Sequence, residues 1–239
     1  MKTMICLILD RSGSMGGREN DVVNGVNSFI EEQKNLPDPA CIAFVRFDTE
    51  ATERFRPMQA LAEVQPITRA DYVPRGGTPL LDAVGKTIAA LEDDWKREQP
   101  ERAIVVIVTD GEENSSHEYK KEKIKEMIQA RQESGKWAFI YLGANVDAFA
   151  EADRMGIALA NAAGYTNTSA GNRAMYATAS SGVRQMRATG QNVAHNLGGD
   201  IAEDGSLTQR QPKTPVPPHA TKTQAWTAPQ AAGPWTPPA

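Results

Sequence analysis

Apolar residues along this 239-residue chain follow two spacings, short continuous runs and longer segments with helical periodicity. The continuous runs cover residues 4–9, 103–109 and 137–143, and such runs are typical of strands that are buried on both faces of a sheet. Helical spacing appears over residues 22–30 and 80–95. Because strands alternate with helices, the pattern predicts an α/β domain with a mainly parallel central sheet and helices on both faces.

Shorter segments complete this prediction. Residues 41–48 and 52–58 are separated by a short polar turn and predict an antiparallel hairpin, so one edge strand of the sheet is expected to be antiparallel. A short helix is expected over residues 146–156, a last edge strand near residues 164–168, and a final helix over residues 170–187.

Two helices have recognisable start signals. Thr78 precedes Pro79, and a capping residue followed by proline at the first helical position is typical of a helix N-terminus. Ser115 and Glu118 have the spacing of a capping box, which would begin the helix that carries residues 124–128.

The domain organisation follows from composition. The formal net charge is −4, but no acidic residue follows Asp204, and residues 205–239 contain eight of the fifteen prolines and three basic residues. Proline cannot join a helix interior or a central strand. We therefore expect a domain over residues 1–190, a linker over 191–204, and an extended or disordered tail over 205–239.

Composition also excludes several classes of protein. There is no basic stripe, so nucleic acid is not an expected partner. No apolar run approaches the ~20 residues of a membrane helix, and Asp10 interrupts the first run before the roughly 7–15 residues of a secretory signal peptide. Cys6 and Cys41 lie in strand-like runs, which is typical of buried free thiols. These features predict a cytoplasmic protein without membrane contact, either free or incorporated in a larger particle.

Polar side chains gather where three of these segments end or begin. Asp10, Ser12 and Ser14 follow the first strand as D-x-S-x-S, Thr78 precedes a helix, and Asp110 follows the strand 103–109. In an open α/β sheet, ligands bind at the carboxyl ends of the strands. Carboxylate and hydroxyl oxygens are the donors that hard cations prefer, so Mg²⁺ or Mn²⁺ is the expected ligand.

The three segments DRSGSM, GGTPLLDA and VTDGEEN resemble the signature loops of the von Willebrand factor A (VWA) domain family, over about residues 1–190. The resemblance implies a Rossmann-like three-layer α/β/α fold and a stand-alone intracellular protein of bacterial or phage type. It also implies a metal-ion-dependent adhesion site formed by Asp10, Ser12, Ser14, Thr78 and Asp110. In this family the metal receives an acidic side chain of a protein partner, so the implied function is a non-enzymatic, metal-dependent interaction module that works as an adaptor.

The same residues also allow other interpretations. A serine hydrolase needs G-x-S-x-G, but Ser12 stands where the first glycine belongs, and a dinucleotide site needs G-x-G-x-x-G, which is absent. A metal-dependent phosphohydrolase with Asp10 as nucleophile remains an alternative, although such sites usually have a second nearby carboxylate. A second alternative is a structural component of a larger assembly, such as a phage particle or a secretion-like machine, with the metal incidental.

Neighbouring residues are candidates for partner contacts. Five lie beside the metal loops and are expected at the rim of the site: Arg11, Met15, Arg75, Glu112 and Glu113. Trp226 and Trp235 stand in a small imperfect repeat in the tail. Because exposed tryptophan next to proline suits an aromatic-lined groove, the tail is expected to make a second docking contact.

Overall fold

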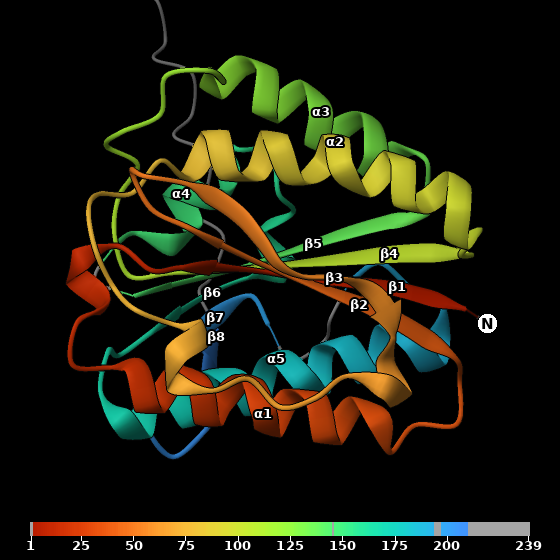
Figure 1. The fold of residues 1–239 in the computed structure, drawn as a ribbon, viewed down its shortest axis with the longest axis horizontal. Helices are drawn as coiled ribbons and strands as arrows, with labels where there is room; N and C mark the ends of the chain where they lie inside the picture. Colours follow the sequence, from red (N-terminus) through yellow and green to blue (C-terminus); the bar gives the residue numbers. More distant parts are fainter. Residues whose placement is uncertain (1, 145, 194–196, 210–239) are drawn as a thin grey trace, which may run out of the picture.

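A computed structural model describes residues 2–144, 146–193 and 197–209 of the protein. In these residues, one eight-stranded sheet forms the centre of the fold (Figure 1). The strands are β1 (Thr3–Asp10), β2 (Ala40–Phe47), β3 (Thr52–Ala60), β4 (Arg102–Thr109), β5 (Trp137–Ala144), β6 (Ala162–Tyr165), β7 (Gly199–Ile201) and β8 (Leu207–Gln209). Their order in the sheet is β3-β2-β1-β4-β5-β6-β7-β8. All neighbours pair in parallel except β2 with β3 and β7 with β8.

Helices cover both faces of the sheet, which gives three layers. The helices are α1 (Glu19–Lys34), α2 (Leu80–Glu98), α3 (Lys121–Glu133), α4 (Ala148–Arg154) and α5 (Ser169–Thr189), with short 3-10 turns η1 (Gly13–Met15), η2 (Leu61–Glu63), η3 (Arg69–Asp71) and η4 (Leu159–Asn161). In Figure 1, α1 and α5 lie on one face, and α2, α3 and α4 lie on the other. The predicted α/β fold with a mainly parallel sheet is therefore confirmed, and so are the predicted hairpin and the final helix.

Alternation along β1 explains how one strand supports two cores. Ile5, Leu7 and Leu9 belong to the apolar cluster under α1 and α5, whereas Cys6 and Ile8 belong to the cluster under α2 and α3. Every residue of β1 and β4 is buried. A strand with apolar side chains on both faces is stable only between two helical layers, so this pattern fixes the centre of the sheet.

The sheet extends past the expected domain boundary at residue 190. Residues 199–201 of the predicted linker form β7, and residues 207–209 of the predicted tail form β8, which is a second antiparallel edge strand. The strand expected near residues 164–168 is found at 162–165, but it is not an edge strand, because β6 pairs with both β5 and β7. Trp226 and Trp235 lie outside the described residues.

Both predicted helix starts need correction. Helix α2 begins at Leu80, with Pro79 as its N-cap, and Thr78 makes no capping bond. Helix α3 begins at Lys121, so Ser115 and Glu118 form no capping box. The N–H of Ser115 instead donates to the carboxylate of Glu113, and the N–H of Glu118 donates to the carboxylate of Asp82. These hydrogen bonds hold the loop before α3 in a fixed, non-helical path.

Two further predictions concern the cysteines and the membrane. Cys6 and Cys41 are free and buried, as expected. Within the described ranges, no helix combines the length and the apolar character that a membrane span requires.

Candidate metal centre

Asp10 and Asp110 lie at the same edge of the sheet because β1 and β4 are parallel neighbours. Asp10 is the last residue of β1, and Asp110 directly follows β4. Asp10 Oδ2 accepts a hydrogen bond of 2.6 Å from Thr109 Oγ1, and Asp10 Oδ1 accepts one of 2.7 Å from the backbone N–H of Ser12. Each carboxylate oxygen therefore accepts a hydrogen bond, and Asp10 is only 1% exposed.

The D-x-S-x-S turn brings both serine hydroxyls to these carboxylates. Ser12 is the N-cap of η1, and the tight turn places Ser12 Oγ 3.0 Å from Ser14 Oγ. Ser14 Oγ donates to Asp110 Oδ1 at 2.6 Å. A chain of hydroxyl contacts thus joins the loop after β1 to the loop after β4.

Thr78 reaches the same place from the loop that precedes α2. A hydrogen bond of 2.9 Å from the Gly13 N–H to the carbonyl of Gly76 joins this loop to the loop that follows β1. A Cβ added to Gly111 would lie 3.2 Å from Thr78 Oγ1 and 3.7 Å from Ser14 Oγ, so both hydroxyls border the space beside this glycine. The structure therefore brings all five predicted ligand residues together.

Several residues that the sequence did not single out hold this arrangement. Asn167, between β6 and α5, donates from Nδ2 to Asp110 Oδ2 at 3.0 Å, and Asn172 donates in turn to Asn167 Oδ1 at 3.1 Å. The hydroxyl of Tyr72 donates to the backbone carbonyl of Asp10. Thr109 was hidden inside an apolar run, and no sequence signal links Asn167 to residues more than fifty positions earlier.

The electrostatics of the two carboxylates favour a cation. Burial raises the pKa of Asp10 to about 6, against the opposing hydrogen bonds from Thr109 and Ser12, and burial likewise raises the pKa of Asp110. Among the described residues, no lysine or arginine forms an ion pair with either carboxylate. Two buried carboxylates without a positive partner are costly, and a bound divalent ion would remove that cost.

The chemistry of the donor set fits a hard divalent ion. Two carboxylates and three hydroxyls supply oxygen only, as Mg²⁺ and Mn²⁺ prefer. The described part of the chain contains no group of three or more His, Cys, Asp or Glu side chains that could hold a metal. The candidate centre therefore differs from sites built mainly from carboxylates or thiolates.

Two of the predicted rim residues face inward. Arg11 is 4% exposed and its Nε lies 2.5 Å from Asp48 Oδ2, because its side chain turns toward the β2–β3 connection. Met15 is 1% exposed, because η1 turns its side chain into the core under α1. Neither side chain is available to a partner, so the rim prediction was wrong for both.

The other three rim residues have different roles. Arg75 is partly exposed and pairs with Asp48 at 3.0 Å and Glu50 at 2.8 Å. Glu113 is occupied within the loop, where its carboxylate accepts the N–H groups of Leu81 and Ser116. Glu112 is exposed and borders a polar hollow at the carboxyl ends of β5, β6 and β7.

The sequence matches a known family over its first half. Residues 5–113 match the von Willebrand factor type A domain, and this range includes all five candidate ligand residues. No curated protein matches the chain closely enough to count as a relative.

Solved structures give more distant likenesses. The chain is 12% identical to the SpRpn10 VWA domain, with a TM-score of 0.46, over 66% of this chain and 83% of that one. It is 16% identical to proximal thread matrix protein 1 from the mussel byssus, with a TM-score of 0.41, over 64% of this chain and only 38% of the mussel chain.

Proposed function

We propose that this chain, whose residues 5–113 match the von Willebrand factor type A domain family, is a protein-interaction module that depends on Mg²⁺ or Mn²⁺. The observation that carries this proposal is that Asp10 and Asp110, which are buried and have no positive partner in the described part of the chain, meet the hydroxyls of Ser12, Ser14 and Thr78. These five residues would hold the ion.

The donor set also indicates what the bound ion would do. Three of the five donors are neutral hydroxyls, so the ion together with its two carboxylates would carry no net negative charge that repels an incoming anion. An incoming aspartate or glutamate of a protein partner would then bind strongly, whereas a neutral side chain would gain little. Arg75 and Glu112, which are exposed beside the loops, remain the proposed partner contacts at the rim.

Binding is favoured over catalysis by the environment of Asp10. Phosphoryl transfer by a nucleophilic aspartate usually also needs a positioned lysine, and among the described residues no lysine forms an ion pair with Asp10 or Asp110. Hydrolysis of a phosphate ester that requires Asp10 would establish the phosphohydrolase alternative instead. Assembly into a larger particle that persists in a chelator would establish the structural alternative.

We expect the protein to select peptides by their carboxylate, in a metal-dependent way. The probes are two displayed libraries of short random peptides, one with a fixed aspartate and one with asparagine at that position. With Mg²⁺, the aspartate library is expected to be enriched at least about tenfold over the asparagine library, because only a charged oxygen gains from the ion. A chelator is expected to remove the enrichment.

Two buried threonines provide a matched pair of variants for the same peptide selection. Thr78→Val removes a proposed ligand hydroxyl, whereas Thr87→Val removes the hydroxyl of an equally buried threonine in α2 whose oxygen has no hydrogen-bond partner. We expect Thr78→Val to lose the enrichment and Thr87→Val to keep it. Equal enrichment of both libraries, or an unchanged result with Thr78→Val, would contradict the proposal.

Mg²⁺ affinity is expected to fall in acid. A proton and the ion compete for the Asp10 carboxylate, and burial raises the pKa of Asp10 to about 6 in the metal-free protein. The Kd should be nearly constant above about pH 7 and about tenfold weaker one pH unit below this pKa, measured by titration calorimetry. A Kd that does not change between about pH 5 and pH 7.5 would show that Asp10 does not bind the ion.

A further inference from the structure

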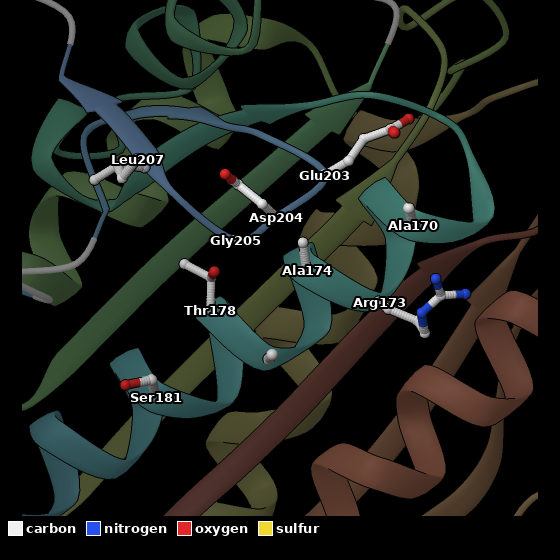
Figure 2. A pocket seen from close by; sticks show the side chains of 10 residues that line it. Ala170, Arg173, Ala174, Thr178, Ser181, Glu203, Asp204, Gly205 and Leu207 are labelled. Carbon is white, nitrogen blue, oxygen red and sulfur yellow. The ribbon is translucent and has the colours of Figure 1, made fainter.

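A groove of about 500 Å³ runs between α5 and the turn that joins β7 to β8 (Figure 2). In Figure 2, α5 forms one wall, and residues 203–205 of the turn lie opposite. The α5 side chains that line it are mostly small: Ala170, Arg173, Ala174, Ala177, Thr178 and Ser181. Their spacing of three and four residues places them on one face of the helix, and Leu207 adds an apolar side chain from β8.

The groove combines an apolar floor with an acidic side. Glu203 and Asp204 line it from the turn, and both are exposed. Hydrogen bonds from the hydroxyl and the N–H of Ser206 hold the pKa of Asp204 below its usual value, so this carboxylate is ionised at neutral pH. Within the described residues, neither carboxylate forms an ion pair with a lysine or arginine. Arg173 also lines the groove, so the lining carries two negative charges and one positive charge, and a basic ligand would meet a net negative charge.

The sequence that follows β8 has the complementary properties. Residues 210–239 carry Arg210, Lys213 and Lys222 but no acidic residue. The same segment contains Trp226 and Trp235, each at the start of a Trp-Thr-x-Pro repeat. The described residues that line the groove include no aromatic side chain, so the groove differs from the aromatic-lined groove that the sequence suggested, and the indole ring would rest on small apolar side chains instead. A proline-rich chain can dock in an extended form without new backbone hydrogen bonds.

We propose that the groove between α5 and the β7–β8 turn is the docking site of this chain's own C-terminal segment, residues 210–239. One or both tryptophans lie against Ala174 and Ala177, and the basic residues face Glu203 and Asp204. The groove thus keeps the tail on the body of the same molecule.

Chain geometry supports docking within one molecule. Leu207 lines the groove and the segment begins three residues later, so the segment is tethered at the groove. Trp226 stands 17 positions after Gln209, and a chain of that length spans roughly 20–25 Å as a coil and about 50 Å in an extended proline-rich form, so Trp226 can reach any point of the groove. The α5 wall from Ala170 to Ser181 is about 16 Å long. Tethering at this range gives an effective concentration of about 1 mM, so even weak contacts suffice.

The test uses the full chain labelled with 5-fluorotryptophan, with the Trp226 and Trp235 signals assigned by single Trp→Phe substitutions. In the unsubstituted chain, at least one of these two ¹⁹F signals is expected away from the position of free tryptophan and protected from a soluble nitroxide. Ala177→Arg blocks the groove and is expected to return that signal to the free position. Ala188→Arg, an equally exposed site on α5 outside the groove, is expected to leave it unchanged.

Two further measurements change the charge of the groove and the concentration of the protein. Asp204→Lys is expected to weaken docking at low salt, whereas Asp153→Lys, an exposed control in α4, is expected to have no effect. Signals at the free position in the unsubstituted chain, or signals that ignore Ala177→Arg in a protein with normal circular dichroism, would overturn the proposal. A shift that disappears on dilution would overturn it in favour of docking onto a second copy.

Discussion

Asp10→Asn is expected to abolish Mg²⁺ binding while leaving the metal-free protein at least as stable as the unsubstituted one. Loss of a partner that only orients a metal ligand already costs about 10–100-fold in affinity. Loss of a proposed ligand carboxylate is therefore expected to cost at least about 100-fold. Titration calorimetry measures the affinity, and thermal unfolding with and without Mg²⁺ measures the stability.

The expected sign of the stability change follows from the buried charge. The pKa of Asp10 rises from 3.8 to about 6 on folding, chiefly through burial, so the folded state binds this proton more tightly than the unfolded state. The metal-free protein therefore loses stability as pH rises through this range. At neutral pH the ionised carboxylate costs about 3 kcal/mol, because its pKa in the folded state is about 6 and not 3.8. Asparagine removes that charge, so unfolding without Mg²⁺ should not become easier.

Asp82 gives the matched contrast. Burial opposes ionisation of Asp82, but the N–H groups of His117, Tyr119 and Glu118 bind its carboxylate and hold its pKa below the usual value. Asp82→Asn should therefore destabilise the metal-free protein and leave Mg²⁺ affinity unchanged. If Asp10→Asn retained Mg²⁺ affinity, or behaved like Asp82→Asn in the absence of metal, the proposed role of Asp10 would be wrong.

Much of the fold and the core of the candidate site could be predicted from sequence, because both depend on short-range patterns. Asp10 and Asp110 directly follow continuous apolar runs, and parallel strands bring such positions to one edge. The position of Thr78 in its loop predicted its place at the site, but the prediction that Thr78 caps the helix was wrong, because Pro79 is the N-cap of α2 and Thr78 makes no capping bond there.

Side-chain direction and long-range partners could not be predicted in this way. Arg11 was predicted at the rim because it lies within the first metal loop, but its side chain pairs with a buried partner, Asp48, and points inward. Met15 lies on the inner side of a single 3-10 turn, which has no periodicity to detect. Asn167 follows a strand whose neighbours β5 and β7 are far away in sequence, so its contact with Asp110 becomes visible only when the sheet is assembled.

Gly171→Ala is expected to destabilise the protein by about 1–2 kcal/mol and to weaken Mg²⁺ binding about tenfold. An added Cβ would lie 2.0 Å from the backbone carbonyl oxygen of Thr166, which is far closer than two such atoms can approach. Alanine would gain about 1 kcal/mol of helix propensity at the start of α5, but relieving so close an overlap with backbone costs about 2–3 kcal/mol, the upper end of the usual range for overpacking.

The effect on metal binding distinguishes this substitution from an ordinary packing defect. Thr166 precedes Asn167, so any shift of this loop moves the side chain that donates to Asp110 Oδ2. Gly199→Ala is the matched control, because its Cβ would meet the backbone oxygen of Thr208 at 2.3 Å, in the β7–β8 pair and outside the loops that carry the ligands. Both variants should unfold at lower denaturant concentration, but only Gly171→Ala should bind Mg²⁺ more weakly. Equal Mg²⁺ affinity in both variants would mean that Asn167 does not position Asp110.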